Sequence, residues 1–361
     1  MVKNKISTFQ FFSILFLTRL LTTVTYIPAY AQGILLSDMI IQALIRAVIG
    51  FAVMLPLFVL FHRNPNMNII DIAEKKWKSL GIIVAVIYLA VLFYYTVATV
   101  SRLDVFTGTI VFPDVKVNFF IILVIMICCY GAYLGIEALG RSAVISVVLV
   151  GVTISFLFAT LLKKIDVMNY TAVFYNGFVP VLKSAFNGAG RTIEYVMIAV
   201  AFPKVSGKKT KGFFVWLIVQ AIVTAVLFLV EIGVMGNFAN TQLFPIHSLA
   251  ALADFSIFKR LDALVTGIWL LCAFLKISFL IYLQMDILKR YFHKFSERKL
   301  LTIIYTFLST VCFALSVSIK GFMTIDNITL KTSIVLSSTF VIPFIILLFD
   351  RREKPCKKQL Q

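Results

Sequence analysis

Charged side chains inside long apolar stretches are the residues of this sequence that could do chemistry. Of the 361 residues, 61% are hydrophobic and only 14% are charged. Arg191 and Glu194 lie three residues apart in one apolar stretch, and Lys276 lies in the middle of another. Because a charge is costly in hydrocarbon, each needs a pairing partner, an aqueous interface or a role in a site. The spacing predicts that Arg191 and Glu194 share a helix face and could pair.

The roles of these charges stay open between structure and mechanism. Lys276 must snorkel, pair or lose its proton, so it could either pack or replace a mobile cation. Arg191 and Glu194 could brace a site or contact a ligand directly. No role is assigned to Arg19 or Arg46, the other two basic residues inside apolar stretches.

Two of the apolar stretches carry residues that interrupt helices. The second half of the first contains Thr25, Tyr26 and Pro28, and another opens with Gly188 and Gly190. Proline removes a backbone donor, and glycine lets a ligand approach the backbone closely. Transporter-like membrane proteins break particular helices near the bilayer centre for this purpose. The alternative is a simple proline kink and a loop–helix junction.

The elements that must position these residues are transmembrane helices. A span needs about 20 apolar residues, and ten such stretches recur without room for a soluble domain. We predict spans at about 8–32, 39–61, 80–101, 118–136, 142–162, 185–203, 212–235, 260–285, 300–319 and 332–349. The interrupted spans are the first and the sixth, which predicts two five-helix repeats over about 8–162 and 185–349, followed by a basic tail at 350–361.

Basic residues in the connections predict the orientation. With the N-terminus in the cytoplasm, the cytoplasmic segments hold 21 Lys and Arg residues and the opposite connections hold 9. This asymmetry follows the positive-inside rule and places both termini in the cytoplasm. It also explains the net charge of +18 without a nucleic-acid partner.

Other classes of site are disfavoured by the sequence. Four of the five cysteines lie in apolar spans without metal or redox spacing, and the three histidines are far apart. We predict no metal and no cofactor. A membrane enzyme should show clustered acids and bases near the interface, for example a histidine beside a carboxylate, and no such cluster is visible.

Several segments in order resemble the spore permease family, the B subunit of nutrient germinant receptors in endospore-forming bacteria. They are residues 6–10 before the first span, 135–141 after the fourth, 191–194 and 201–203 in the sixth, 236–240 and 244–249 after the seventh, and 258–262 before the eighth. The resemblance covers nearly the whole chain.

The resemblance implies more than the residues themselves do. It implies an all-α, five-plus-five inverted-repeat fold of the amino acid–polyamine–organocation superfamily with a pocket between spans 1, 3, 6 and 8. It implies a small nutrient ligand, an amino acid in the first place, and A and C subunits as partners at the spore inner membrane. The ligand-binding candidates on this basis are Thr25, Tyr26, Pro28, Tyr94, Tyr95, Gly188 and Gly190, with Arg191, Glu194 and Lys276 as supporting or coupling charges.

Two readings of function remain from the sequence. The chain could be a receptor subunit whose conformation shifts on ligand binding, or an amino acid–proton symporter of the same fold, because fold does not settle function. The polar segment 237–259 predicts a short helix that caps the outer vestibule between spans 7 and 8.

Overall fold

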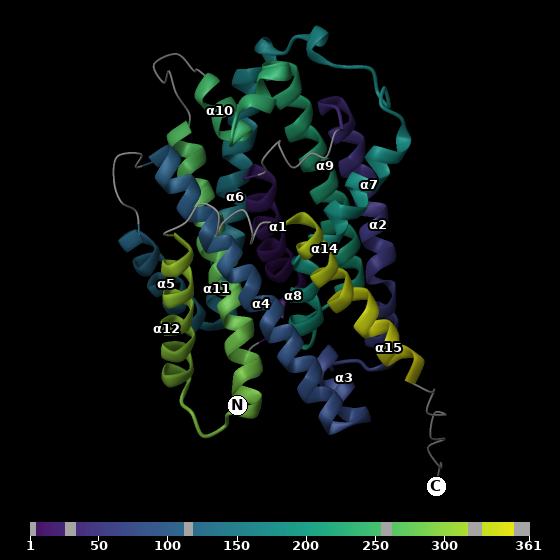
Figure 1. Cartoon of the computed structure of the whole chain (residues 1–361), viewed down its shortest axis with the longest axis vertical. Coiled ribbons are helices and arrows are strands. Elements are labelled where there is room, and N and C mark those ends of the chain that lie inside the picture. The colour runs from purple at the N-terminus through teal and green to yellow at the C-terminus, as the bar shows by residue number, and fades with distance from the viewer. Residues whose placement is uncertain (1–4, 26–33, 112–117, 254–261, 317–326, 350–361) are drawn as a thin grey trace.

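The computed structural model describes residues 5–25, 34–111, 118–253, 262–316 and 327–349, and these residues are almost entirely helical (Figure 1). The long helices are α1 (Thr8–Val24), α2 (Leu36–Arg63), α4 (Lys78–Phe106), α5 (Asn118–Tyr133), α6 (Gly135–Leu161), α9 (Lys209–Met235), α11 (Asp262–Tyr291) and α12 (Glu297–Ser316). The shorter helices are α3 (Ile69–Lys76), α7 (Phe178–Gly190), α8 (Glu194–Ala201), α10 (Pro245–Leu252), α14 (Ile328–Leu336) and α15 (Ile342–Phe349).

Each predicted span has a helical counterpart among these elements. Among the described residues, seven helical segments are long and apolar enough to cross a membrane: α2, α4, α6, α9, α11, α12 and the α14–α15 region. The other three predicted spans correspond to α1, α5 and the pair α7–α8. The chain is therefore an all-helical, multi-pass membrane protein, with apolar side chains exposed along its helices where lipid would lie.

The sixth span is broken, as predicted, and the break follows the two glycines. Its predicted start near residue 185 is wrong: α7 begins at Phe178 and ends at Gly190, and α8 begins at Glu194. The predicted start was late because Phe178–Leu182 follow a polar connection and carry a proline, Pro180, that fits the first turn of a helix. Residues 191–193 form the interruption.

The helix of the first span ends before the predicted end of that span near residue 32. α1 ends at Val24, where Thr25 caps it, so α1 is shorter than a full crossing. The predicted continuation through Tyr26 and Pro28 lies outside the described residues. Ser7 caps the start of α1 in a capping box with Gln10.

A short parallel ladder ties the start of α1 to the end of α8. β1 (Ile6–Ser7) pairs with β2 (Val205–Ser206), with Ile6 opposite Val205. The Thr8 hydroxyl donates to the Ser206 carbonyl oxygen at 2.7 Å. This pairing holds two segments 199 residues apart at the same end of the bundle.

The helix contacts repeat with an offset of five spans. α1 packs on α6 and α9, while α7 packs on α14 and α2. Because α6 and α14 follow α1 and α7 by four spans, α1 and α7 each contact the last helix of their own repeat and the second helix of the other. α4 packs on α11, the third span of each repeat. This exchange of partners is the pattern that two inverted repeats produce.

The two ends of the bundle carry different connecting elements. α3 and the α11–α12 connection lie at one end, and α10 lies at the other (Figure 1). α10 packs against α1, α9 and α11, so a short helix caps the bundle between spans 7 and 8, where it was predicted. Residues 254–261 of that connection lie outside the described residues.

Candidate ligand-binding pocket

A polar cavity of about 150 Å³ lies in the middle of the helix bundle. Its described walls come from α1, α2, α4, α7, α11 and α14. A cavity of this volume holds a molecule about the size of benzene. Since the six elements include α1, which ends at Val24, and α7, which ends at the break of the sixth span, the cavity lies where helix ends expose backbone to a ligand.

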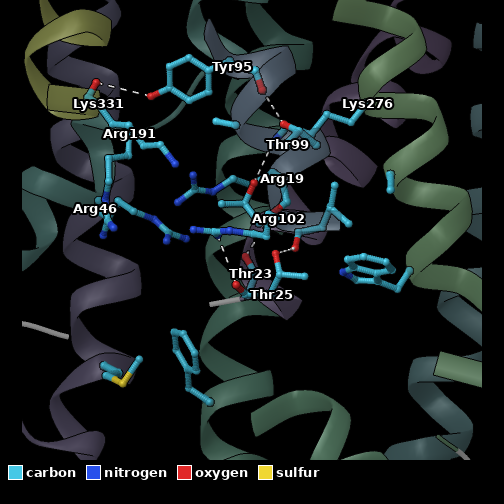
Figure 2. A pocket seen from close by; sticks show the side chains of 18 of the residues that line it. Arg19, Thr23, Thr25, Arg46, Tyr95, Thr99, Arg102, Arg191, Lys276 and Lys331 are labelled. Atoms are coloured by element: carbon cyan, nitrogen blue, oxygen red, sulfur yellow. Dashed lines mark hydrogen bonds between the residues drawn. The ribbon is translucent and has the colours of Figure 1, made fainter. Parts of the chain in front are cut away.

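The structure brings together five of the residues singled out from the sequence. Thr25, Tyr95, Gly188, Arg191 and Lys276 all line the cavity. The Thr25 hydroxyl donates to the Leu21 carbonyl oxygen at 2.6 Å, which leaves its lone pairs to accept from a ligand. The Tyr95 hydroxyl donates to the Lys331 carbonyl oxygen at 3.4 Å (Figure 2).

The other candidates lie elsewhere or outside the described part. The Tyr94 ring contacts the Tyr95 ring edge-on, with centroids 5.5 Å apart, but Tyr94 is not among the described residues that line the cavity. Gly190 packs on α14, where an added Cβ would come within 2.5 Å of Thr332 Cγ2. Tyr26 and Pro28 lie outside the described residues.

Gly188 is the glycine that opens onto the cavity. An added Cβ there would lie 2.9 Å from the Gln42 amide nitrogen and 3.0 Å from Arg46 Cδ. Both neighbours also line the cavity. A glycine at this position therefore lets the end of α7 approach α2 closely beside the space for a ligand.

The interruption between α7 and α8 is stabilised locally. The Thr192 hydroxyl donates to the Gly188 carbonyl oxygen at 3.1 Å, and Arg191 Nε donates to the Asn187 carbonyl oxygen at 3.2 Å. The Thr192 hydroxyl satisfies a carbonyl group that has lost its helical partner, because the Thr192 N–H bonds to the Ala189 carbonyl oxygen instead, whereas the Asn187 carbonyl also accepts from the Arg191 backbone N–H.

Lys276 joins α11 to α1 and to the start of α8. Its ammonium donates to the Thr22 hydroxyl at 2.8 Å and to the Thr18 carbonyl oxygen at 3.2 Å. It also pairs with the Glu194 carboxylate at 3.7 Å. The Arg191–Glu194 spacing argument assumed an unbroken helix, and the break at residues 191–193 removes that geometry. Glu194 is buried and has Lys276 as its charge partner.

Sequence reasoning missed most of the cations in the pocket. Arg19 and Arg46 line the cavity from α1 and α2, and Arg102 and Lys331 line it from α4 and α14. Arg102 and Lys331 were placed in connections, a prediction that the helix bounds overturn. The helices α4 and α14 extend further than the apolar runs that marked them. For Arg19 and Arg46, the signal was available, since an arginine inside a span marks a site by default.

An aromatic cluster closes the cavity toward α10. Trp269 lines the cavity and stacks on Phe106 with ring centroids 3.9 Å apart. Phe106 in turn contacts Phe244 at 5.0 Å and the His247 ring at 5.6 Å, just before and within α10. The cluster lies between the cavity and the end of the bundle that carries α10.

Broken helices in opposed repeats, with a polar cavity between them, define a transporter-like membrane protein. The sequence model of the spore permease family, described as spore germination protein, matches residues 5–320. The chain belongs to this family. No curated protein matches the chain significantly.

A solved structure supports the fold assignment. The chain is similar to a Na⁺-coupled sialic acid symporter, captured in a substrate-bound, outward-open state, with a TM-score of 0.60 and 14% sequence identity. The match covers 93% of this chain and 79% of the symporter. At this identity the similarity concerns the fold, and it agrees with the opposed repeats deduced from the helix contacts.

Proposed function

We propose that this chain is the transmembrane subunit of a spore nutrient germinant receptor. It binds a small nutrient, an amino acid in the first place, in the cavity between α1, α4, α7 and α11. The observation that carries the proposal is a polar, ligand-sized cavity at the break between α7 and α8, in a chain of the spore germination family. A purely structural bundle has no need for a buried cavity lined by hydroxyl, amide and cationic side chains.

The receptor hypothesis requires that ligand binding favours one conformation of the helix bundle. A ligand that contacts both α7 and α2 across Gly188 can do this, because the break gives α7 and α8 separate positions relative to α1. A and C subunits of the receptor would then detect the change. The chain would lie in the spore inner membrane with both termini in the cytoplasm, as its basic connections predict.

The test is germination of spores that lack this gene, scored against single amino acids and sugars. We expect loss of the response to one nutrient class and its return with the intact gene. A strain that retains every response, also when related receptor genes are deleted, would contradict the receptor function.

A second candidate function is amino acid–proton symport. The buried Lys276–Glu194 pair supports it, because a paired ammonium and carboxylate beside a substrate cavity can exchange a proton. Uptake of labelled nutrient by proteoliposomes that contain only this chain distinguishes the receptor function from the symporter function. Saturable, proton-driven uptake favours the symporter, and binding without uptake favours the receptor.

A further inference from the structure

Four arginines from four different elements meet at the cavity. Arg19 comes from α1, Arg46 from α2, Arg102 from α4 and Arg191 from the break after α7. Their guanidinium groups point toward a common centre (Figure 2). An arginine stays protonated in a protein, so these four positive charges persist inside the bundle. Lys276 and Lys331 add two more cationic side chains.

The described lining of the cavity contains no carboxylate to balance these charges. None of its described residues is Asp or Glu, and the nearby Glu194 pairs with Lys276. Within the part of the chain that the structure describes, the ion pairs include neither Arg19 nor Arg46.

Arg19 and Arg46 are also poor in hydrogen bonds. Arg19 is only 5% exposed, and its guanidinium has no acceptor among the described residues. Arg46 donates to the Thr224 hydroxyl at a long 3.4 Å, which uses one of its five N–H groups. A buried guanidinium without an acceptor is costly, so Arg19, with the partly buried and weakly bonded Arg46, indicates an anion that completes the site.

Other groups around the cavity favour an acid with two anionic ends. Trp269 lines the cavity, and its indole N–H has no acceptor among the described residues. The arginines arrive from opposite walls, α1 and α4 on one side and α2 and α7 on the other (Figure 2). The guanidinium fork matches a carboxylate in geometry. Arg19 and Arg46 reach the cavity from these two walls, so an acid with an anionic group at each end can contact both.

We propose that the cavity selects a small di-acid, either an acidic amino acid or a dicarboxylic acid of similar length. This proposal names the class of nutrient that the receptor would bind. It rests on the proposed function for the role of the ligand as a nutrient, but the binding itself can be tested without it. The volume of about 150 Å³ limits the ligand to a short carbon chain. The hydroxyls of Thr23, Thr25 and Thr99 donate to backbone carbonyls, and their lone pairs can accept from an amino group.

The test is ligand binding to the full chain in nanodiscs, measured by isothermal titration calorimetry and by the thermal shift of unfolding. The probes are glutamate and aspartate, their amides glutamine and asparagine, alanine, succinate and inorganic phosphate. We expect at least one of the acids to bind about tenfold or more tightly than its amide, since the amide removes one charge-assisted contact. Equal binding of the amide, tighter binding of alanine, or no binding of any di-acid would overturn the proposal.

The remaining probes identify the source of the anion. Succinate binding as well as glutamate assigns a dicarboxylic acid, and glutamate binding alone assigns an acidic amino acid. Both results support a di-acid site. Phosphate that competes as well as either would overturn the di-acid assignment, because it would show a site for any compact anion.

Variants test the arginines themselves. Arg19→Gln is expected to lower di-acid affinity about tenfold or more and Arg19→Lys to restore part of it. The matched control is Arg141→Gln, because Arg141 is 72% exposed on α6 and pairs with Glu137 outside the cavity. The glutamate–glutamine comparison needs no variant, so it decides the question even if Arg19→Gln does not fold.

Failure of this proposal is distinguishable from failure of the proposed function. Spores without the gene that lose the response to a neutral nutrient, together with a purified chain that ignores di-acids, leave the receptor function standing and overturn the di-acid site. If the purified chain binds a di-acid but deletion of its gene changes no germination response, the di-acid site stands and the receptor function is overturned.

Discussion

The Lys276 ammonium on α11 lies 3.7 Å from the carboxylate of Glu194, the first residue of α8. Both side chains are buried, with exposed fractions of 5% and 1%. Because the same ammonium donates to α1 through Thr18 and Thr22, one positive charge links α1, α8 and α11 at the break between α7 and α8. The pair therefore couples the position of α8 to that of α1 and α11.

Removing one member of this pair should destabilise the protein strongly. Lys276→Met leaves the Glu194 carboxylate buried without its charge partner, and we expect a loss of about 3–5 kcal/mol in the free energy of unfolding. Lys276→Met combined with Glu194→Gln should recover most of that loss. Thermal unfolding of the purified variants in detergent measures both.

The matched control is Lys289→Met, because Lys289 pairs with Glu297 at positions 34% and 49% exposed. An exposed pair contributes about 0–1 kcal/mol. Equal effects of the two methionine variants would show that the Lys276–Glu194 pair does not join the elements as described.

Apolar runs were enough to predict the helices of this fold but not their ends. A run of about 20 apolar residues marks a span whatever its partners, and each predicted span has a helical counterpart. The bounds failed where helices continue through polar residues, as at Arg102 in α4 and Lys331 in α14. Tertiary contacts keep those turns helical, and a hydrophobic run carries no information about them.

The site was predictable in part for the same reason. Gly188, Thr25 and Lys276 were found because their residue types are unusual inside a span. The partner of Glu194 was not predictable, since Lys276 lies 82 residues further along the chain and only the packing of α8 on α11 brings the two together. The exchange of helices between repeats sets such contacts, and it leaves no local trace in the sequence.

The two glycines of α7 should behave differently when enlarged. Gly188→Ala places a methyl group 2.9 Å from the Gln42 amide nitrogen and 3.0 Å from Arg46 Cδ at the cavity wall, so we expect loss of nutrient binding with a normal amount of protein. Gly190→Leu disrupts helix packing, because its side chain clashes with Thr332 on α14. We expect it to lower the amount of folded protein as well. Immunoblots of membranes and titration of bound nutrient measure the two effects.

Gly151→Ala on α6 is the matched control, because an added Cβ there meets no described atom within 4 Å. It should leave both amount and binding unchanged. If Gly188→Ala binds nutrient with wild-type affinity, the ligand does not occupy the cavity beside α7.

The aromatic cluster under α10 should slow ligand escape. Phe106→Ala removes the ring stacked on Trp269 and its contacts with Phe244, and truncating a buried phenylalanine costs about 3–5 kcal/mol of stability. We expect faster dissociation of bound nutrient, measured by exchange of a labelled ligand. Phe9→Ala, at a ring that is 66% exposed, is the control that should leave dissociation unchanged.

Phe106→Leu separates packing from closure. Leucine keeps much of the buried volume but cannot stack on the indole, so dissociation should still be faster while stability falls less. Wild-type dissociation in both variants would mean that ligand leaves by another route.

The opposite end of the bundle carries an ion pair with a defined pH dependence. Lys204 follows α8 and donates to the Asp286 carboxylate and, at 2.8 Å, to the Tyr282 hydroxyl on α11. Burial alone would lower the pKa of Lys204, but the Asp286 carboxylate and the Tyr282 hydroxyl outweigh it and raise the pKa. The charged lysine is therefore favoured in the folded state.

The sign of this shift sets the expected pH profile. A folded-state pKa above the unfolded value gives stability that is complete below the unfolded pKa of about 10.4 and is lost as pH rises through the folded pKa. Asp286→Asn should destabilise the protein by about 2 kcal/mol at pH 8. The difference from wild type should shrink above about pH 10.4, because deprotonation then removes the same pair. Thermal unfolding between pH 8 and pH 11.5 tests this, with Glu297→Gln at the exposed pair as the control. A difference that stays constant across that range would show that Asp286 stabilises the bundle without the Lys204 charge.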